Sequence, residues 1–166
     1  MTRCLLVGDS LMVGASPYIR HLRPHWTFEE NAVVGRDTDS GLDAAQLLIP
    51  RFRPNIIMVS LGTNDAASNM DNWVACINQM RKYAGLDAYM VWATIHRLHN
   101  GHDPYKEWNE YLHWRNKFKK FEVADWSKLV KKKRELLAPD QIHATPTGYR
   151  ERALLYLSAA ERLRVR

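Results

Sequence analysis

A serine near the N-terminus has a sequence context that suits a nucleophile. The apolar run Leu5-Leu6-Val7 leads into Gly8-Asp9-Ser10, and a segment compatible with a helix follows. This order predicts a buried strand ending in a sharp turn, with Ser10 exposed at the start of the next helix. Unsatisfied backbone N–H groups at that point favour the negative charge that a nucleophile builds beside itself. Asp, Ser and Gly are also ordinary turn and helix-cap residues, so this stretch alone does not establish catalysis.

A histidine near the other end of the chain could act as the base for that serine. The segment Asp140-Gln141-Ile142-His143 places a carboxylate three residues before an imidazole. Asp140 can therefore curl back to one ring nitrogen of His143 and leave the other nitrogen for a serine hydroxyl, as in a Ser-His-Asp triad. An Asp-x-x-His pair is common, and a surface loop with a capping Asp is the alternative interpretation.

The tetrahedral oxyanion of such a reaction needs hydrogen-bond donors. The N–H groups of Ser10 and Gly35 and the side-chain amide of Asn64 lie at predicted strand ends that could converge. Glycine suits close approach of the backbone to a substrate, and asparagine supplies a neutral NH2 group that can be oriented. Asp65, which follows Asn64, is predicted to cap the next helix.

Predicted strands and helices alternate along the chain. The alternation predicts βαβ units and a parallel sheet with helices on both faces, in which sites form beyond the carboxyl ends of the strands. The helix that follows the first strand is expected to be interrupted, or to start, near Ser16-Pro17. The expected strands span residues 3–8, 26–34, 56–61, 88–95 and 121–126, and the expected helices span residues 11–22, 39–52, 73–85, 105–118, 129–137 and 147–163.

Length and composition indicate one globular domain over residues 1–166. The chain is 46% hydrophobic and 25% charged, and no apolar run approaches the roughly 18 residues that span a bilayer. The first strand is predicted to begin almost at Met1, so we expect no signal peptide. We therefore expect a cytoplasmic protein without a membrane partner, released by lysis or carried in a particle if it acts elsewhere. Cys4 and Cys76 are predicted to be free, buried thiols.

Basic residues exceed acidic residues by 24 to 18, a net charge of +6. Much of the excess lies in residues 131–134 and in the last predicted helix. Such runs can bind nucleic acid, but no aromatic-interleaved basic motif or known nucleic-acid signature accompanies these charges. We interpret them as solvated helix faces and expect no nucleic-acid partner.

Together these motifs resemble the four blocks of the SGNH hydrolase superfamily, the GDSL-type esterases and lipases. The resemblance implies a flavodoxin-like three-layer α/β/α sandwich with a central five-stranded parallel sheet. It also implies Ser10 as nucleophile, Ser10, Gly35 and Asn64 as oxyanion donors, His143 as base, Asp140 as its orienting carboxylate, and no metal or cofactor. In chain order the blocks are Gly8-Asp9-Ser10, Gly35, Gly62-Thr63-Asn64-Asp65 and Asp140-Gln141-Ile142-His143.

Two details of the blocks bear on loop shape and reaction type. Residues 8–15 read Gly-Asp-Ser-Leu-Met-Val-Gly-Ala, which is similar to the SGNH domains of peptidoglycan O-acetyltransferases. The glycine usual between the family's Asp and the next apolar residue is replaced by Gln141, which puts the shape of that loop in question.

Other candidates lie near the fourth strand end. His96, His99 and His102 have a spacing that invites a metal site, but no cysteine or carboxylate set completes one. We predict no metal there and consider His96 a candidate for substrate contact. Trp114 falls off the apolar helix face that contains Trp108, and it is a candidate platform for a sugar.

The sequence therefore predicts a serine esterase that acts on short-acyl, preferably acetyl, esters through an acyl-Ser10 intermediate. An O-acetylated carbohydrate is preferred over a long-chain lipid, because no long apolar lid insertion is evident. One alternative is a glycan O-acyltransferase, and another is a non-catalytic carbohydrate-binding or structural module on the same fold. A nucleotide-binding protein is disfavoured, because no phosphate-cradling glycine loop follows the first strand.

Overall fold

Five strands form one parallel sheet in the computed structural model, which describes residues 1–165. Their order across the sheet is β2-β1-β3-β4-β5, the doubly wound order of flavodoxin-like folds. This arrangement confirms the predicted five-stranded parallel sheet. The strands are β1 (Arg3–Gly8), β2 (Thr27–Ala32), β3 (Ile56–Ser60), β4 (Tyr89–Ala93) and β5 (Phe121–Ala124).

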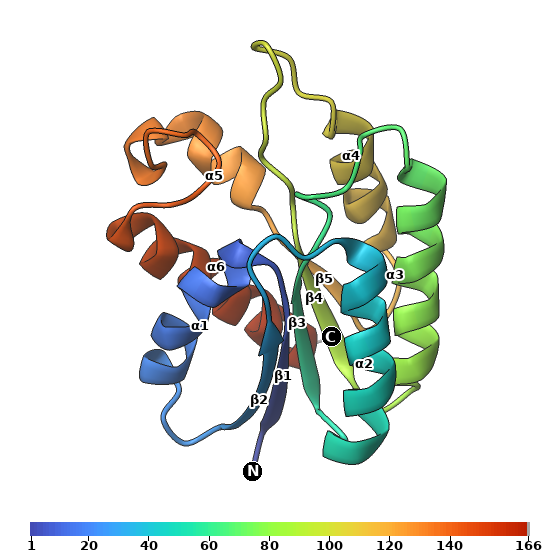
Figure 1. The fold of residues 1–166 in the computed structure, drawn as a ribbon. Coiled ribbons are helices and arrows are strands. Elements are labelled where there is room, and N and C mark those ends of the chain that lie inside the picture. The colour runs from blue at the N-terminus through green and yellow to red at the C-terminus, as the bar shows by residue number, and fades with distance from the viewer. Residues whose placement is uncertain (166) are drawn as a thin grey trace.

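Helices cover both faces of the sheet and make three layers (Figure 1). Helices α1 and α6 pack together on one face, and α2, α3 and α4 line the other. The helices are α1 (Ser10–Leu22), α2 (Thr38–Phe52), α3 (Met70–Ala84), α4 (Lys106–Arg115), α5 (Trp126–Lys132) and α6 (Pro146–Val165), with a short 3₁₀ helix, η1 (Arg134–Leu136), before the last loop.

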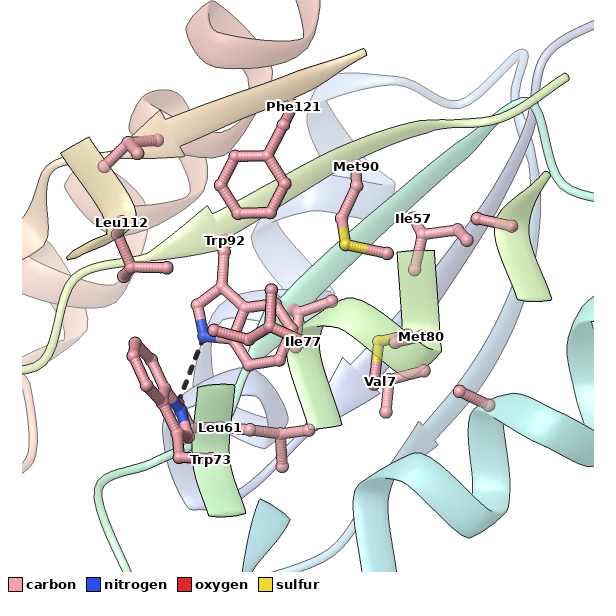
Figure 2. Close-up of a cluster of buried hydrophobic side chains, with 14 of the residues drawn as sticks. Val7, Ile57, Leu61, Trp73, Ile77, Met80, Met90, Trp92, Leu112 and Phe121 are labelled. Atoms are coloured by element: carbon pink, nitrogen blue, oxygen red, sulfur yellow. Dashed lines mark hydrogen bonds between the residues drawn. The ribbon is translucent and has the colours of Figure 1, made fainter. Parts of the chain in front are cut away.

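The central strands are buried on both faces, which explains their continuous apolar sequence. Successive side chains of a strand point to opposite faces, so each strand contributes to two cores. In β1, Leu5 and Val7 join the core under α2, α3 and α4, whereas Cys4 and Leu6 join the core under α1 and α6. Figure 2 shows the first of these cores, where strand residues such as Ile57 meet side chains of α3.

The helix α1 runs without interruption through Pro17, contrary to the expected break. A proline inside a helix removes one backbone hydrogen bond. The helix is held by an apolar face, since Met12, Ala15 and Ile19 are fully buried against the sheet. Tertiary packing therefore outweighs the local effect of the proline.

The predicted helix over residues 129–137 is instead two shorter elements. The Asp125 carboxylate accepts a hydrogen bond from the N–H of Lys128 at 3.3 Å and caps α5 three residues earlier than expected. The chain leaves the helical path at Lys133 and makes one 3₁₀ turn. Both cysteines are free and buried, as predicted. No helix within residues 1–165 is long and apolar enough to cross a membrane.

Two buried tryptophans of the core in Figure 2 provide a test of the fold. Trp92 Nε1 donates to the Leu61 carbonyl at 3.2 Å, whereas Trp73 Nε1 has no hydrogen-bond partner among residues 1–165. We expect Trp92→Phe to lower the free energy of unfolding by about 1 kcal/mol more than Trp73→Phe, since only the first change breaks a buried hydrogen bond. Urea denaturation of the two variants measures this difference, and an equal loss would contradict the assignment.

Candidate active site

The turn after β1 presents Ser10 at the first position of α1. Asp9 is the N-cap of this helix, and its carboxylate accepts a hydrogen bond from the N–H of Leu11 at 3.0 Å. Gly8 is required before it, because a Cβ there would lie 2.4 Å from Met12 Cβ and 2.9 Å from the Ser60 carbonyl. The Ser10 N–H is thus among the first N–H groups of the helix, which have no partner inside it.

The serine hydroxyl meets the predicted base directly. Ser10 Oγ lies 2.9 Å from His143 Nε2, although the two residues are 133 positions apart in the chain. The contact forms because the loop before α6 returns to the carboxyl edge of the sheet, beside the start of α1 (Figure 1). This distance is within the reach that general-base catalysis requires.

The second ring nitrogen of His143 is held by Asp140. His143 Nδ1 lies 2.6 Å from Asp140 Oδ2, and Asp140 Oδ1 accepts from the N–H groups of Ile142 and His143, both at 2.9 Å. The hydrogen bond with His143 makes the largest contribution and the two backbone N–H groups the next, and together they lower the pKa of Asp140 to about 2. The carboxylate is therefore charged at neutral pH and keeps Nε2 directed at the serine.

The residue that replaces the usual glycine adopts the backbone conformation of a glycine. Gln141 has a φ of 59°, in the left-handed region that side chains with a Cβ rarely occupy. The loop keeps the geometry that brings Asp140 onto His143 in spite of the substitution. The contact of Asp140 with His143 is made, and Gln141 carries local backbone strain.

The two other predicted oxyanion donors lie in neighbouring loops at the same edge of the sheet. Asn64 Nδ2 donates to the Arg36 carbonyl at 2.9 Å, which joins the loop after β3 to the loop that contains Gly35. Gly35 has a φ of 77°, and no atom lies within 4 Å of the position a Cβ would take. Its backbone conformation explains the glycine in this structure.

Asp65 does not cap the helix that follows it, contrary to the prediction. Its carboxylate accepts from Thr38 N at 3.1 Å and from Thr38 Oγ1 at 2.7 Å, at the start of α2. The N-cap of α3 is Asn69, which makes no capping hydrogen bond with its side chain. Asp65 therefore connects two strand-end loops, a role that depends on tertiary proximity.

A cavity of about 410 Å³ lies next to Asn64. Arg97 Nη1 donates to the Thr63 carbonyl at 2.6 Å, and Tyr105 Oη donates to the Asp65 carbonyl at 2.7 Å, so two of its wall residues are tied to the Asn64 loop. Sequence reasoning did not single out Arg97 or Tyr105. The residues that line the cavity are Asn64, Asp65, Ala66, Ala67, Arg97, His99, Pro104 and Tyr105.

Of the histidines after β4, His99 and not His96 lies beside this cavity. His96 is completely buried, and its two ring nitrogens have no hydrogen-bond partner within residues 1–165. Burial lowers the pKa of His96 most, and the nearby positive charge of Arg134 lowers it further. It is therefore no surface contact for a substrate.

Residues 99–102 form a tight antiparallel turn with Asn-Gly at its centre, a hairpin signal visible in the sequence.

Trp114 is exposed, as predicted, but it lies away from Ser10. Its ring packs against that of Phe118, with 4.8 Å between the ring centroids. Phe118 and Tyr89, the first residue of β4, border the same hollow. Trp114 is thus near the amino ends of the strands, opposite the edge where Ser10 lies. Within residues 1–165, no three His, Cys, Asp or Glu side chains are grouped to hold a metal ion.

No family model and no curated protein matches the sequence, whereas solved structures match the fold. The C-terminal catalytic domain of Streptococcus pneumoniae peptidoglycan O-acetyltransferase A has a TM-score of 0.83 at 19% identity, over 98% of this chain and 94% of that one. A lipolytic protein of the G-D-S-L family from Veillonella parvula also reaches 0.83, at 15% identity, over 98% and 100%. The esterase EstA from Pseudoalteromonas sp. reaches 0.76 at 12% identity over the full length of both chains.

These neighbours confirm the predicted resemblance at the level of the fold. The chain has the three-layer architecture of the SGNH, or GDSL, hydrolases. The neighbours that share this architecture include esterases and an O-acetyltransferase domain.

The role of Asp140 can be tested by an isosteric change. We expect Asp140→Asn to lower kcat for an activated ester by about 10²- to 10⁴-fold, because an amide no longer selects the tautomer of His143 that faces Ser10. The melting temperature should change little, because the Asp140 side chain is 48% exposed. Steady-state kinetics and thermal denaturation on the same samples check both points. A variant with wild-type kcat would exclude Asp140 from catalysis.

Gln141 offers a test of the loop. We expect Gln141→Gly to retain activity and to change the free energy of unfolding by less than about 1 kcal/mol, because relief of the left-handed strain offsets the entropy gained by the unfolded chain. Gln141→Val should be destabilising, since a β-branched residue tolerates this conformation poorly. Denaturation of both variants tests the assigned backbone geometry, and Val as stable as Gly would be inconsistent with it.

Proposed function

We propose that this protein is a serine esterase that transfers a short acyl group from an ester to Ser10 and then to water. The observation that carries the proposal is the continuous set of contacts from Ser10 Oγ through the imidazole of His143 to the Asp140 carboxylate. A partly buried serine with no catalytic role would need neither a base at 2.9 Å nor a carboxylate behind that base.

The first half of the reaction forms the acyl-enzyme. His143 Nε2 accepts the Ser10 proton while Ser10 Oγ attacks the ester carbonyl, and the oxyanion is stabilised by the N–H groups of Ser10 and Gly35 and by the amide of Asn64. The bond from the carbonyl carbon to the alcohol oxygen then breaks, and His143 returns the proton to the departing alcohol.

The second half releases the acid. Water gives a proton to His143 and attacks the acyl carbon, after which the bond to Ser10 Oγ breaks and the serine recovers its proton. The openness of the site supports a role for water, since the side chains of His143 and Asp140 are 40% and 48% exposed.

The cavity beside Asn64 supports a polar substrate. Arg97 and His99 are hydrogen-bond donors in its wall, and a long alkyl chain placed against them would leave polar groups without partners. A sugar or another hydroxyl-rich group can satisfy such donors. We therefore propose an acetylated carbohydrate as the natural class of ester.

The first test is hydrolysis of p-nitrophenyl acetate, butyrate and octanoate by the wild-type protein and by Ser10→Ala. We expect the rate to fall with chain length and to drop at least about 10³-fold in the variant, because the nucleophile is lost. Ser10→Ala should fold normally, which circular dichroism checks. Turnover that persists in the variant would refute acyl-Ser10 chemistry, and a preference for octanoate would refute the short-acyl assignment.

A glycan O-acyltransferase is the second candidate, favoured by the likeness to the O-acetyltransferase A domain. The two reactions share the acyl-enzyme and differ in the acceptor. Adding oligosaccharides during p-nitrophenyl acetate turnover separates them, because a transferase forms acetylated sugar at the expense of acetate. Acetate in full yield at saturating acceptor would leave hydrolysis as the reaction.

A further inference from the structure

An arginine is buried behind the nucleophile turn. Arg152, in α6, is 2% exposed, and its guanidinium lies over the rings of Trp126 and Tyr156 at 5.1 and 5.8 Å. Its Nη2 donates to Ser60 Oγ at 2.9 Å, while Nε and Nη1 have no hydrogen-bond partner among residues 1–165. Burying a cation with so few hydrogen bonds is costly unless an opposite charge compensates it.

The compensating charge is Asp9, the residue before Ser10. Asp9 is completely buried, and its Oδ1 accepts from Ser60 Oγ at 2.9 Å as well as from the N–H of Leu11. Burial raises the pKa of Asp9, and the attraction of Arg152 opposes that shift. Asp9 and Arg152 therefore meet through a single hydroxyl group.

The Ser60 hydroxyl connects Arg152 to Asp9 through two hydrogen bonds. Its hydroxyl accepts from Arg152 and donates to Asp9, which requires a group that is both acceptor and donor. The Ser60 carbonyl also accepts from the N–H of Asp9 at 2.9 Å. The last residue of β3 thus holds Asp9 by its backbone and by its side chain.

These contacts close a circuit around the catalytic hydrogen bond. His143 lies just before the start of α6, and Arg152 lies farther along the same helix. Ser10 is joined to α6 on one side by its contact with His143, and on the other by the series Asp9, Ser60 and Arg152. Ser10 and His143 are therefore both tied to α6.

We propose that Arg152 and Ser60 are positioning residues that hold the Asp9–Ser10 turn so that Ser10 Oγ stays within hydrogen-bond reach of His143 Nε2. The proposal rests on the proposed function of Ser10 as nucleophile. Both residues are buried behind the turn, where a substrate does not reach them. An uncharged side chain such as methionine would fill the space between Trp126 and Tyr156 without a buried charge, but it would leave the Asp9 carboxylate without its compensating cation.

The test compares Ser60→Ala and Arg152→Met with Arg150→Met, a control on the same helix whose side chain is 56% exposed. For p-nitrophenyl acetate we expect kcat to fall about ten- to a hundredfold in the first two variants with KM unchanged, since displacement of a reacting group lowers the rate without weakening binding. Arg152→Lys, which keeps the charge, should recover part of the loss. Values of kcat equal to that of the control would overturn the proposal.

A double variant separates positioning from charge compensation alone. Asp9→Asn combined with Arg152→Met removes both buried charges and keeps a residue that caps helices well. We expect thermal stability to recover relative to Arg152→Met while kcat stays low. Recovery of kcat along with stability would mean that Arg152 only neutralises Asp9, and it would overturn the positioning role.

An NMR measurement separates failure of this proposal from failure of the proposed function. The ¹⁵N chemical shift of His143 Nε2 reports its hydrogen bond with Ser10 whether or not the protein hydrolyses esters. It should move in Ser60→Ala and Arg152→Met but not in Arg150→Met. An inactive wild-type protein would refute the esterase alone, whereas an unchanged shift in Ser60→Ala and Arg152→Met would refute the positioning circuit.

Discussion

The buried carboxylate of Asp9 is the point at which the sheet, the first helix and the last helix meet. It caps α1 through the N–H of Leu11 and accepts the hydroxyl of Ser60 at the end of β3. The close approach of β1 to β3 that this contact needs leaves no room for a side chain at Gly8. Burial of the Asp9 side chain is costly without partners of this kind, and the turn that they hold presents Ser10 at the first position of α1.

The proposed base and its orienting carboxylate are held in a different way. Asp140 and His143 are roughly half exposed, so little of their orientation comes from burial. Backbone N–H groups of the same short loop bind one oxygen of Asp140, and the imidazole binds the other. A buried turn therefore presents Ser10, the proposed nucleophile, while a locally hydrogen-bonded surface loop presents His143, the proposed base. Solvent reaches the side chains of His143 and Asp140, which suits the proposed reaction, in which water attacks last.

Much of the fold could be predicted because its determinants are local. Apolar runs such as residues 56–61 indicate buried strands, and parallel strands joined by helices place all their carboxyl ends at one edge. Ser10 follows a strand and His143 precedes a helix at that edge, so their contact is consistent with the topology. The contact of Asp140 with His143 could also be predicted, because the two residues are only three positions apart in the chain.

The sequence by itself determined the alternation of elements, the edge of the sheet at which the proposed active site lies, and the residues proposed as nucleophile, base and orienting carboxylate. Only the tertiary structure decided that His96 is buried, that Trp114 lies at the opposite end, and that Asp65 binds at α2. It also decided that Arg152, in a helix that reads as a basic surface, is buried against Trp126. These outcomes depend on which distant segments cover a side chain, whereas periodicity and turn chemistry report only on its neighbours in the chain.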